Sequence, residues 1–191
     1  MSARGGASVG KITRGIACAM KTLFLVRHAK SSWDDASVAD RERPLAGRGE
    51  RDAPAMGKRL ERRGVRPDLI VSSPALRARL TAELLAEQLE YKRKDIVIDD
   101  RLYARGPDAL LEVIHAVDDG IKRVMLVGHN PELTELAHRI CRDIAHLPTC
   151  AVARFTFDAR SWADIGEASL AGTELDYPKK ASGEAPRRDP A

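Results

Sequence analysis

The sequence predicts an α/β fold of three layers, in which a mostly parallel central sheet carries helices on both of its faces. Short apolar runs of strand length alternate along the chain with longer segments in which leucines recur at helical spacing. This alternation is typical of parallel strands joined by helices. The chain has 191 residues, of which 43% are hydrophobic, and this suits one domain with a sizeable core.

The order of the elements follows from these runs. The expected strands, in chain order, cover residues 23–26, 68–71, 96–98, 124–127, 152–157 and 170–177. The expected helices cover residues 48–63, residues 74–89, a segment that Pro107 opens and a segment that Pro131 opens. In the first of these helices, Ala55, Met56 and Leu60 are expected to face inward.

Prolines mark the positions at which two of the helices are expected to begin. Ser73 is the predicted N-cap of the second helix and Pro74 suits its first position, so that Arg77 is expected in the first turn. Pro131 repeats this pattern after the fourth strand. Pro54, in contrast, falls inside the first predicted helix, where we expect it to kink the helix or to move its start.

The two ends of the chain differ from its middle. Residues 1–20 have no lasting apolar period, and we expect a disordered N-terminal extension there; their lack of acids also faintly resembles an organellar transit segment. Residues 178–191 are polar and are expected to form a disordered tail. The folded domain is therefore predicted to span residues 21–177.

Composition excludes several functional classes. The basic residues that give the net charge of +4 are concentrated in the two ends, and aromatic residues make up only 4% of the chain, so a nucleic-acid surface is not expected. No apolar run approaches the roughly 20 residues of a membrane span. Cys18, Cys141 and Cys150 lack the spacing of a disulfide framework or a metal site, which predicts reduced thiols in a cytoplasmic protein. Cys150 is interpreted as a small packing residue rather than as a nucleophile.

Arginines and histidines follow the ends of three of the predicted parallel strands. Arg27 and His28 follow the first strand, Arg77 follows the second, and His129 follows the fourth. Singly, an arginine at a helix start is usually solvated and a histidine at a strand end is usually structural. Parallel strands, however, place their carboxyl ends at one edge of the sheet. Two arginines and two helix N-termini at that edge would bind a phosphoryl group.

Three motifs carry a resemblance to a known family. They read LVRHAKSSW at residues 25–33, SSPALRARLTAE at residues 72–83 and VGHNPE at residues 127–132. In this order, and over about residues 21–180, they resemble the histidine phosphatase superfamily, whose fold is that of the phosphoglycerate mutases. More narrowly, they resemble its small SixA-like branch of phosphohistidine phosphatases.

The resemblance implies a role for each residue of the three strand ends. His28 would be the nucleophile, and Arg27, Arg77 and His129 would complete the phosphate pocket. Ser31 stands where many relatives have a serine or threonine near the phosphate. Asp34 stands where some phosphoglycerate mutases have a phosphate-binding asparagine, so no such contact is inferred for it.

The implied reaction begins with attack of a neutral His28 on phosphorus, which gives a phosphohistidine intermediate that water then hydrolyses. Repulsion from Arg27 and Arg77 disfavours the imidazolium form of His28. His129, if protonated, would add a donor to the phosphoryl oxygens. Positioning and electrostatics dominate such phosphoryl transfer, and neither a metal nor another cofactor is expected.

One departure from the family bears on the substrate. Tyr103 stands about where larger members carry a glutamate general acid, a group that is typically worth about 10²–10⁴-fold in rate. Without an acid, sugar alkoxides should leave slowly, whereas the nitrogen of a phosphoramidate departs readily. This favours phosphohistidine in a protein as the substrate, unless Ser32 or a loop aspartate supplies the proton.

Two alternatives stay open at this stage. One is a small-molecule phosphomonoesterase, which would act on a small phosphorylated substrate. The other is an interaction module that binds phosphate without turnover. In each case we expect a monomer that binds neither nucleic acid nor membrane.

Overall fold

The computed structural model describes residues 20–180, and its centre is a six-stranded sheet with the strand order β3-β2-β4-β1-β5-β6. The strands are β1 (Met20–Arg27), β2 (Leu69–Ser72), β3 (Val97–Ile98), β4 (Arg123–Gly128), β5 (Val152–Asp158) and β6 (Leu170–Asp176). Strands β3, β2, β4 and β1 are parallel, whereas β5 runs antiparallel to β1 and β6 antiparallel to β5. The predicted mostly parallel sheet is therefore confirmed.

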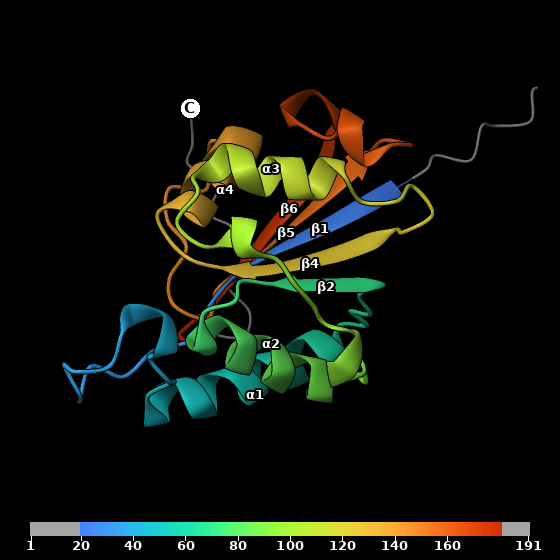
Figure 1. Cartoon of the computed structure of the whole chain (residues 1–191). Coiled ribbons are helices and arrows are strands. Elements are labelled where there is room, and N and C mark those ends of the chain that lie inside the picture. The colour runs from blue at the N-terminus through green and yellow to red at the C-terminus, as the bar shows by residue number, and fades with distance from the viewer. Residues whose placement is uncertain (1–19, 181–191) are drawn as a thin grey trace, which may run out of the picture.

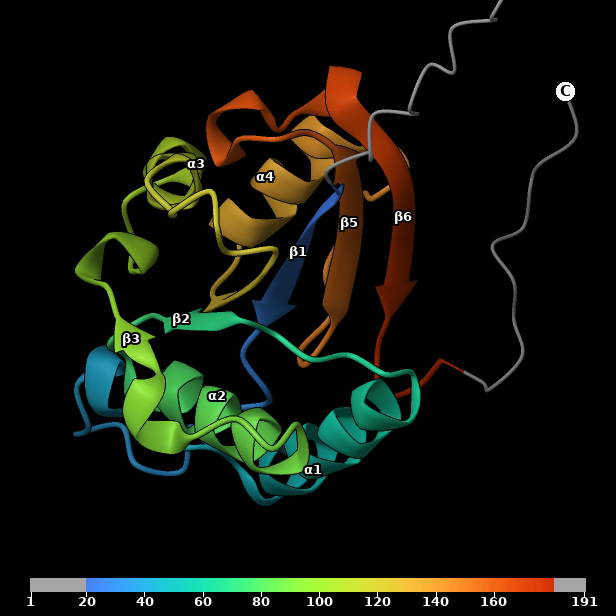
Figure 2. The ribbon, with the colours of Figure 1, turned by 90° about the vertical axis from the view of Figure 1, so that its right-hand side faces the viewer.

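Helices cover both faces of this sheet. They are α1 (Gly47–Arg62), α2 (Leu76–Gln88), α3 (Pro107–His115) and α4 (Glu132–Ile140), and short 3₁₀ turns, among them Asp40–Glu42 and Asp100–Leu102, lie in the connections. Figures 1 and 2 show α1 and α2 on one face of the sheet and α3 and α4 on the other. The three-layer α/β architecture is thus confirmed.

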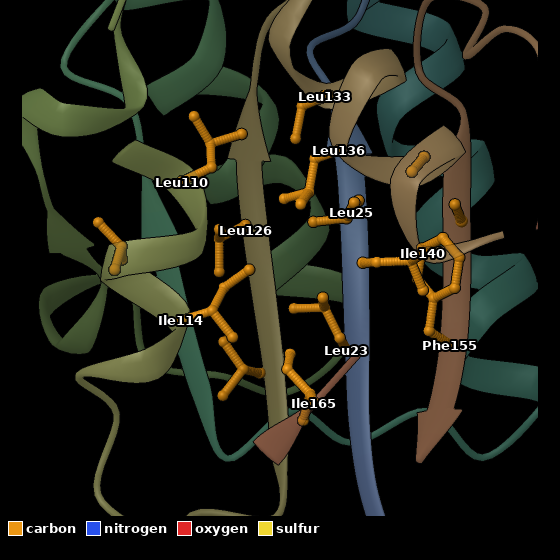
Figure 3. Close-up of a cluster of buried hydrophobic side chains, with 14 of the residues drawn as sticks. Leu23, Leu25, Leu110, Ile114, Leu126, Leu133, Leu136, Ile140, Phe155 and Ile165 are labelled. Carbon is orange, nitrogen blue, oxygen red and sulfur yellow. The ribbon is translucent and has the colours of Figure 1, made fainter. Parts of the chain in front are cut away.

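The alternation of side chains along β1 explains why both faces need cover. Leu23 and Leu25 pack with α3 and α4, where they meet leucines and isoleucines of both helices (Figure 3). Phe24 and Val26 point to the other side and pack in the cluster beneath α1 and α2. All four side chains are at most 2% exposed. A strand that is apolar on both faces can only be satisfied by a layer of helices on each side.

Two predicted helix starts are wrong by one or two residues. Helix α2 begins at Leu76 with Ala75 as its N-cap, so Ser73 is not the cap and Pro74 is not the first helical residue. Helix α4 begins at Glu132, with Pro131 in the N-cap position instead of the first helical one. Before α2 the chain stays extended for longer after β2, because the backbone amide of Ser73 donates to the Val127 carbonyl in β4. Arg77 nevertheless lies in the first turn, as predicted.

Helix α1 also differs in detail from its prediction. Pro54 lies inside the helix without moving its start, which is Gly47. Ala55 is exposed, and the buried face is formed instead by Ala53, Met56 and Leu60 together with two glycines.

Part of the prediction for the chain ends lies outside the described residues. Within the described range, Met20 already belongs to β1, and residues 178–180 form a turn after β6. The remainder of the predicted extension and tail, together with Cys18, is not described. Among residues 20–180, no helix combines the length and the apolar character that crossing a membrane requires.

Candidate active site

Strand pairing brings the predicted site residues to one edge of the sheet. Arg27, the last residue of β1, stands beside Gly128, the last residue of β4. The amide of His28 donates to the Gly128 carbonyl at 3.0 Å, which continues the pairing past both strand ends. His28 and His129 therefore lie next to each other, and their ring centroids are 5.0 Å apart. Parallel pairing of two strands far apart in sequence thus brings the two histidines together.

The imidazole of His28 is 9% exposed, and one of its nitrogens is already committed. Nδ1 lies 2.7 Å from the carbonyl oxygen of Ala29, which can only accept, so Nδ1 carries a proton. Burial, aided by the charges of Arg77, Arg27 and Arg43, lowers the pKa of His28 to about 4. At neutral pH the ring is uncharged, and Nε2 holds a free lone pair. This is the protonation state in which an imidazole can act as a nucleophile.

His129 is 7% exposed and is held by Ser73, which follows β2. Its Nε2 lies 2.7 Å from Ser73 Oγ, and this hydroxyl also accepts the amide of Ala75 at 3.3 Å. The Ser73 proton is then free for Nε2, which leaves a proton on Nδ1, and Nδ1 has no partner among residues 20–180. Burial, followed by the influence of His28 and Arg77, lowers the pKa of His129 to about 3. His129 is therefore a neutral donor in the unliganded site, not the protonated one considered from the sequence.

Both predicted arginines reach this region. Arg27 Nη1 donates to the Leu147 carbonyl at 2.9 Å, and its buried Nε has no partner within the described residues. Burial lowers the pKa of Arg27. Arg77 is 7% exposed, and both of its terminal nitrogens donate to Asp40: Nη1 to the backbone oxygen, and Nη2 to Oδ2 at 2.9 Å. The two guanidinium groups act on His28 from different chain segments.

Ser31 lies beside the same region and is tied to a residue that the sequence did not single out. Its Oγ accepts from Arg43 Nη2 at 2.8 Å, so the hydroxyl proton of Ser31 is not used in that bond. Arg43 is 6% exposed, donates to the Ser32 carbonyl, and lies with its guanidinium 3.2 Å from the ring centroid of Trp33. Arg43 thus fixes the shape of the loop that follows His28.

Comparison with known proteins now identifies the family. The sequence model of the histidine phosphatase superfamily (branch 1) matches residues 23–106. A protein of Mycobacterium tuberculosis is 32% identical over 160 residues, which are 77% of this chain and 97% of that protein. A chloroplastic protein of Arabidopsis thaliana is 31% identical over 153 residues, which are 75% and 70% of the two chains. This chain belongs to the histidine phosphatase superfamily.

Solved structures place this histidine phosphatase near the SixA-like branch. The proposed phosphohistidine phosphatase SixA of Nakamurella multipartitia superimposes with a TM-score of 0.73 at 25% identity, covering 84% of this chain and 98% of that one. The proposed SixA of Agrobacterium tumefaciens gives 0.68 at 27% identity, covering 81% and 97%. The resemblance read from the three motifs, and the phosphoglycerate mutase-like fold that it implies, are confirmed.

Tyr103 and Asp40 occupy the flank of the histidine pair. The ring of Tyr103 meets that of His129 edge-on, with centroids 5.4 Å apart. Its hydroxyl donates to Asp40 Oδ2 at 2.8 Å, and burial together with this bond raises the pKa of Tyr103. Hydrogen bonds from Tyr103, Arg77 and Arg43 outweigh partial burial and lower the pKa of Asp40 to about 2. Neither side chain is therefore a ready proton donor near neutral pH.

Sequence reasoning missed Asp40 and Arg43, because they lie in a polar loop with many other charged residues. The one available signal is Leu45, an apolar residue that is 5% exposed and bridges to Ser31, which shows that the loop returns to the core. Two of the side-chain partners of Asp40, Arg77 and Tyr103, are 37 and 63 residues away in the chain, and no local pattern reports such a distance.

The remaining chemical candidates of this histidine phosphatase lie outside the cluster. Cys150 is buried, and burial raises the pKa of its thiol to about 12, which confirms the packing role and excludes a thiolate nucleophile at neutral pH. Cys141 is also a free thiol. Residues 20–180 contain no group of three or more histidine, cysteine, aspartate or glutamate side chains with metal-site geometry.

Proposed function

We propose that this histidine phosphatase hydrolyses phosphohistidine in a protein through a covalent intermediate on His28. One observation carries the proposal. The Ala29 carbonyl holds Nδ1 of a neutral, buried His28 and leaves Nε2 as the reactive nitrogen. The centroids of the His28 and His129 rings are 5.0 Å apart, and three arginines act on His28. In this arrangement the nucleophile needs no base to remove a proton.

The proposed reaction has two in-line steps. First, Nε2 of His28 attacks phosphorus, the bond from phosphorus to the leaving nitrogen breaks, and the Nε2–P bond forms. Water then attacks the phosphohistidine, releases inorganic phosphate and returns the lone pair to Nε2. Arg27, Arg77 and His129 Nδ1–H donate to the equatorial oxygens, where charge is spread in the transition state. The Ser31 hydroxyl proton is a further donor to those oxygens.

The protonation states of the site favour a leaving group that can depart without a proton from a general acid. Asp40 is ionised, the pKa of Tyr103 is raised, and the Ser32 hydroxyl donates to Asp34 Oδ2 at 2.6 Å. None of the donors considered from the sequence is therefore well suited as a general acid at neutral pH. A phosphohistidine nitrogen tolerates this lack better than a sugar alkoxide does, so phosphohistidine is the substrate class that the site favours.

We expect His28→Ala to abolish turnover, because no other side chain of the cluster offers a free lone pair to phosphorus. Arg77→Ala should raise KM and lower kcat together, by on the order of 100-fold or more in kcat/KM, because it removes charge that stabilises both bound substrate and transition state. Phosphate release from a phosphohistidine protein measures both effects. His115→Ala, an exposed histidine at the end of α3, is the matched control and should behave like the wild type.

The same assay separates the two open alternatives. Faster turnover of sugar phosphates than of phosphohistidine would make this protein a small-molecule phosphomonoesterase. Binding of phosphate without turnover of either substrate would make it an interaction module. Full activity of His28→Ala would overturn the mechanism itself.

A further inference from the structure

A residue of the same loop and residues of two distant segments all bond to the carboxylate of Asp40. Arg43 Nη1 donates to Oδ1 at 2.9 Å, while Arg77 Nη2 and the Tyr103 hydroxyl donate to Oδ2 at 2.9 and 2.8 Å. The backbone oxygen of Asp40 accepts from the other terminal nitrogen of Arg77. Asp40 begins a 3₁₀ turn in the loop between β1 and α1, drawn in blue beside α2 in Figure 1. The loop, the start of α2 and the segment after β3 are thus joined at one residue.

We propose that Asp40 is the positioning residue for Arg77, which it holds in the orientation needed to bind the phosphoryl group. This inference rests on the proposed function, because it assigns Arg77 the role of anion ligand. A guanidinium has five N–H groups. Asp40 takes one from each terminal nitrogen, and the other three stay available for an anion. The contact therefore orients the arginine without exhausting it.

Asp40 also balances the positive charge of the arginines around it. Arg27, Arg43 and Arg77 all act on His28, and each disfavours its protonation. Asp40 contacts two of these three arginines directly. Like charges at close range repel one another, and a long arginine side chain relieves such repulsion by changing rotamer. A carboxylate between Arg43 and Arg77 offsets this repulsion and keeps both side chains in place.

The position of Asp40 distinguishes positioning from chemistry. The carboxylate is ionised at neutral pH and is bonded to three side chains, so it has no proton to give to a leaving group. Its charge acts on His129 but is not among the main influences on His28. Asp40 thus acts on the reaction through Arg77 and Tyr103, and not on the substrate itself.

Another reading of the same contacts predicts the opposite result. If the Asp40 carboxylate occupied the place of the phosphoryl group, its removal would free Arg77 and tighten anion binding. If Asp40 positions Arg77, its removal loosens the arginine and weakens anion binding. The sign of the change in affinity therefore decides between the two.

The test measures the affinity of the full-length protein for orthovanadate, an oxyanion that needs no knowledge of the natural substrate. For Asp40→Asn we expect the Kd to rise about tenfold and kcat/KM to fall by on the order of 10–100-fold, because small displacements of a charged ligand group are costly in phosphoryl transfer. Asp35→Asn is the matched control. It removes the same charge from the same loop, where Asp35 bonds only to Ser37 in the described structure, and it should bind vanadate like the wild type.

A spectroscopic readout reports the contact itself. Burial is the largest cause of the raised pKa of Tyr103, and the hydrogen bond and charge of Asp40 raise that pKa further. In Asp40→Asn the ultraviolet titration of tyrosinate should therefore show one of the three tyrosines ionising at lower pH, and Tyr103→Phe identifies which signal shifts. A general loss of folding would shift all tyrosines and the melting temperature together. Asp40→Glu keeps the charge at a longer reach and should bind vanadate with intermediate affinity.

Unchanged or tighter vanadate binding by Asp40→Asn would overturn the positioning role. So would an unchanged Tyr103 titration. Failure of the proposed substrate is a separate result. Wild-type protein that binds vanadate but does not hydrolyse phosphohistidine would contradict the proposed substrate. The ratio of the vanadate Kd of Asp40→Asn to that of the wild type would still test the role of Asp40.

Discussion

At the scale of single residues, burial decides the chemistry of this site. His28 and His129 are ordinary histidines in sequence, but each is below 10% exposed and lies near guanidinium groups. A charged imidazole in that setting loses hydration and is repelled by its neighbours, so the neutral form wins. The hydrogen bonds to Ala29 and Ser73 then select which nitrogen of each ring carries the proton.

We expect both rings to stay neutral down to about pH 4 in the folded protein, as NMR titration of the five histidines should show. Spectra of His28→Ala assign the His28 resonance. Because the two rings are adjacent, the apparent pKa values observed at low pH belong to the pair of histidines and not to either ring alone. A His28 resonance that titrates near the ordinary value of about 6.5 would contradict the burial argument.

The same shift has a consequence for stability. The folded pKa of His28 lies below its unfolded value, so below about pH 6.5 the unfolded chain takes up a proton that the folded chain refuses. The contribution of His28 is therefore constant above that pH and becomes destabilising as the pH falls toward 4. Denaturant unfolding of His28→Asn should show a shallower loss of stability across this window.

At the scale of elements, the first turn of α1 sets the position of the loop after β1. A Cβ atom on Gly49 would overlap the backbone carbonyl oxygen of Lys30, two residues after His28. The carbonyl of Lys30 also accepts the amide of Ala46 at 2.9 Å. Helix and loop are therefore in direct backbone contact, so the position of α1 determines the position of the residues that follow His28.

Gly49→Ala should lower the free energy of unfolding by about 1–3 kcal/mol, because the overlap is with backbone that cannot turn aside. Activity should fall as well, since the loop that carries Ser31 and Asp40 must shift. Gly47→Ala is the control in the same turn: its new Cβ would lie 3.6 Å from Arg51 Nη1, an ordinary contact. Equal stability of the two variants in chemical denaturation would refute the close approach.

At the scale of the whole molecule, the parallel sheet brings residues from distant parts of the chain to one edge. Each face is covered by a pair of helices and its own apolar cluster, so the strands cannot slip without exposing core residues (Figure 2). The candidate site lies where strands of this buried sheet end, and anion binding should be coupled to global stability.

Inorganic phosphate should therefore raise the melting temperature. At a concentration one hundred times its Kd, a ligand that binds only the folded state adds about 2.7 kcal/mol. For a chain of this size that corresponds to roughly 5–10 °C, measurable by scanning calorimetry. Potassium chloride at equal ionic strength is the control and should have a much smaller effect. Arg77→Ala should lose most of the shift; a full shift in that variant would place phosphate elsewhere.

Much of the fold was accessible from the sequence, because its signals are local. The apolar run that ends at Arg27 and His28, and the corresponding run before His129, identify buried strands and the residues at their ends. The helix starts were less accessible. Ser73 has the chemistry of an N-cap, but in the folded protein its hydroxyl bonds to His129, and Ala75 takes the cap position. The Ser73 hydroxyl is therefore shared between the nearby amide of Ala75 and a histidine 56 residues away.

The sequence by itself determined the α/β architecture, the family and the four residues at the strand ends, since each depends on neighbours along the chain. Only the tertiary structure decided that Asp40 joins Arg43, Arg77 and Tyr103, and that His129 is a neutral donor. Hydrogen bonds between distant segments depend on how layers pack, and burial exists only once they have packed. The residues of the candidate site can thus be identified from local sequence, whereas their charge and orientation depend on the folded structure.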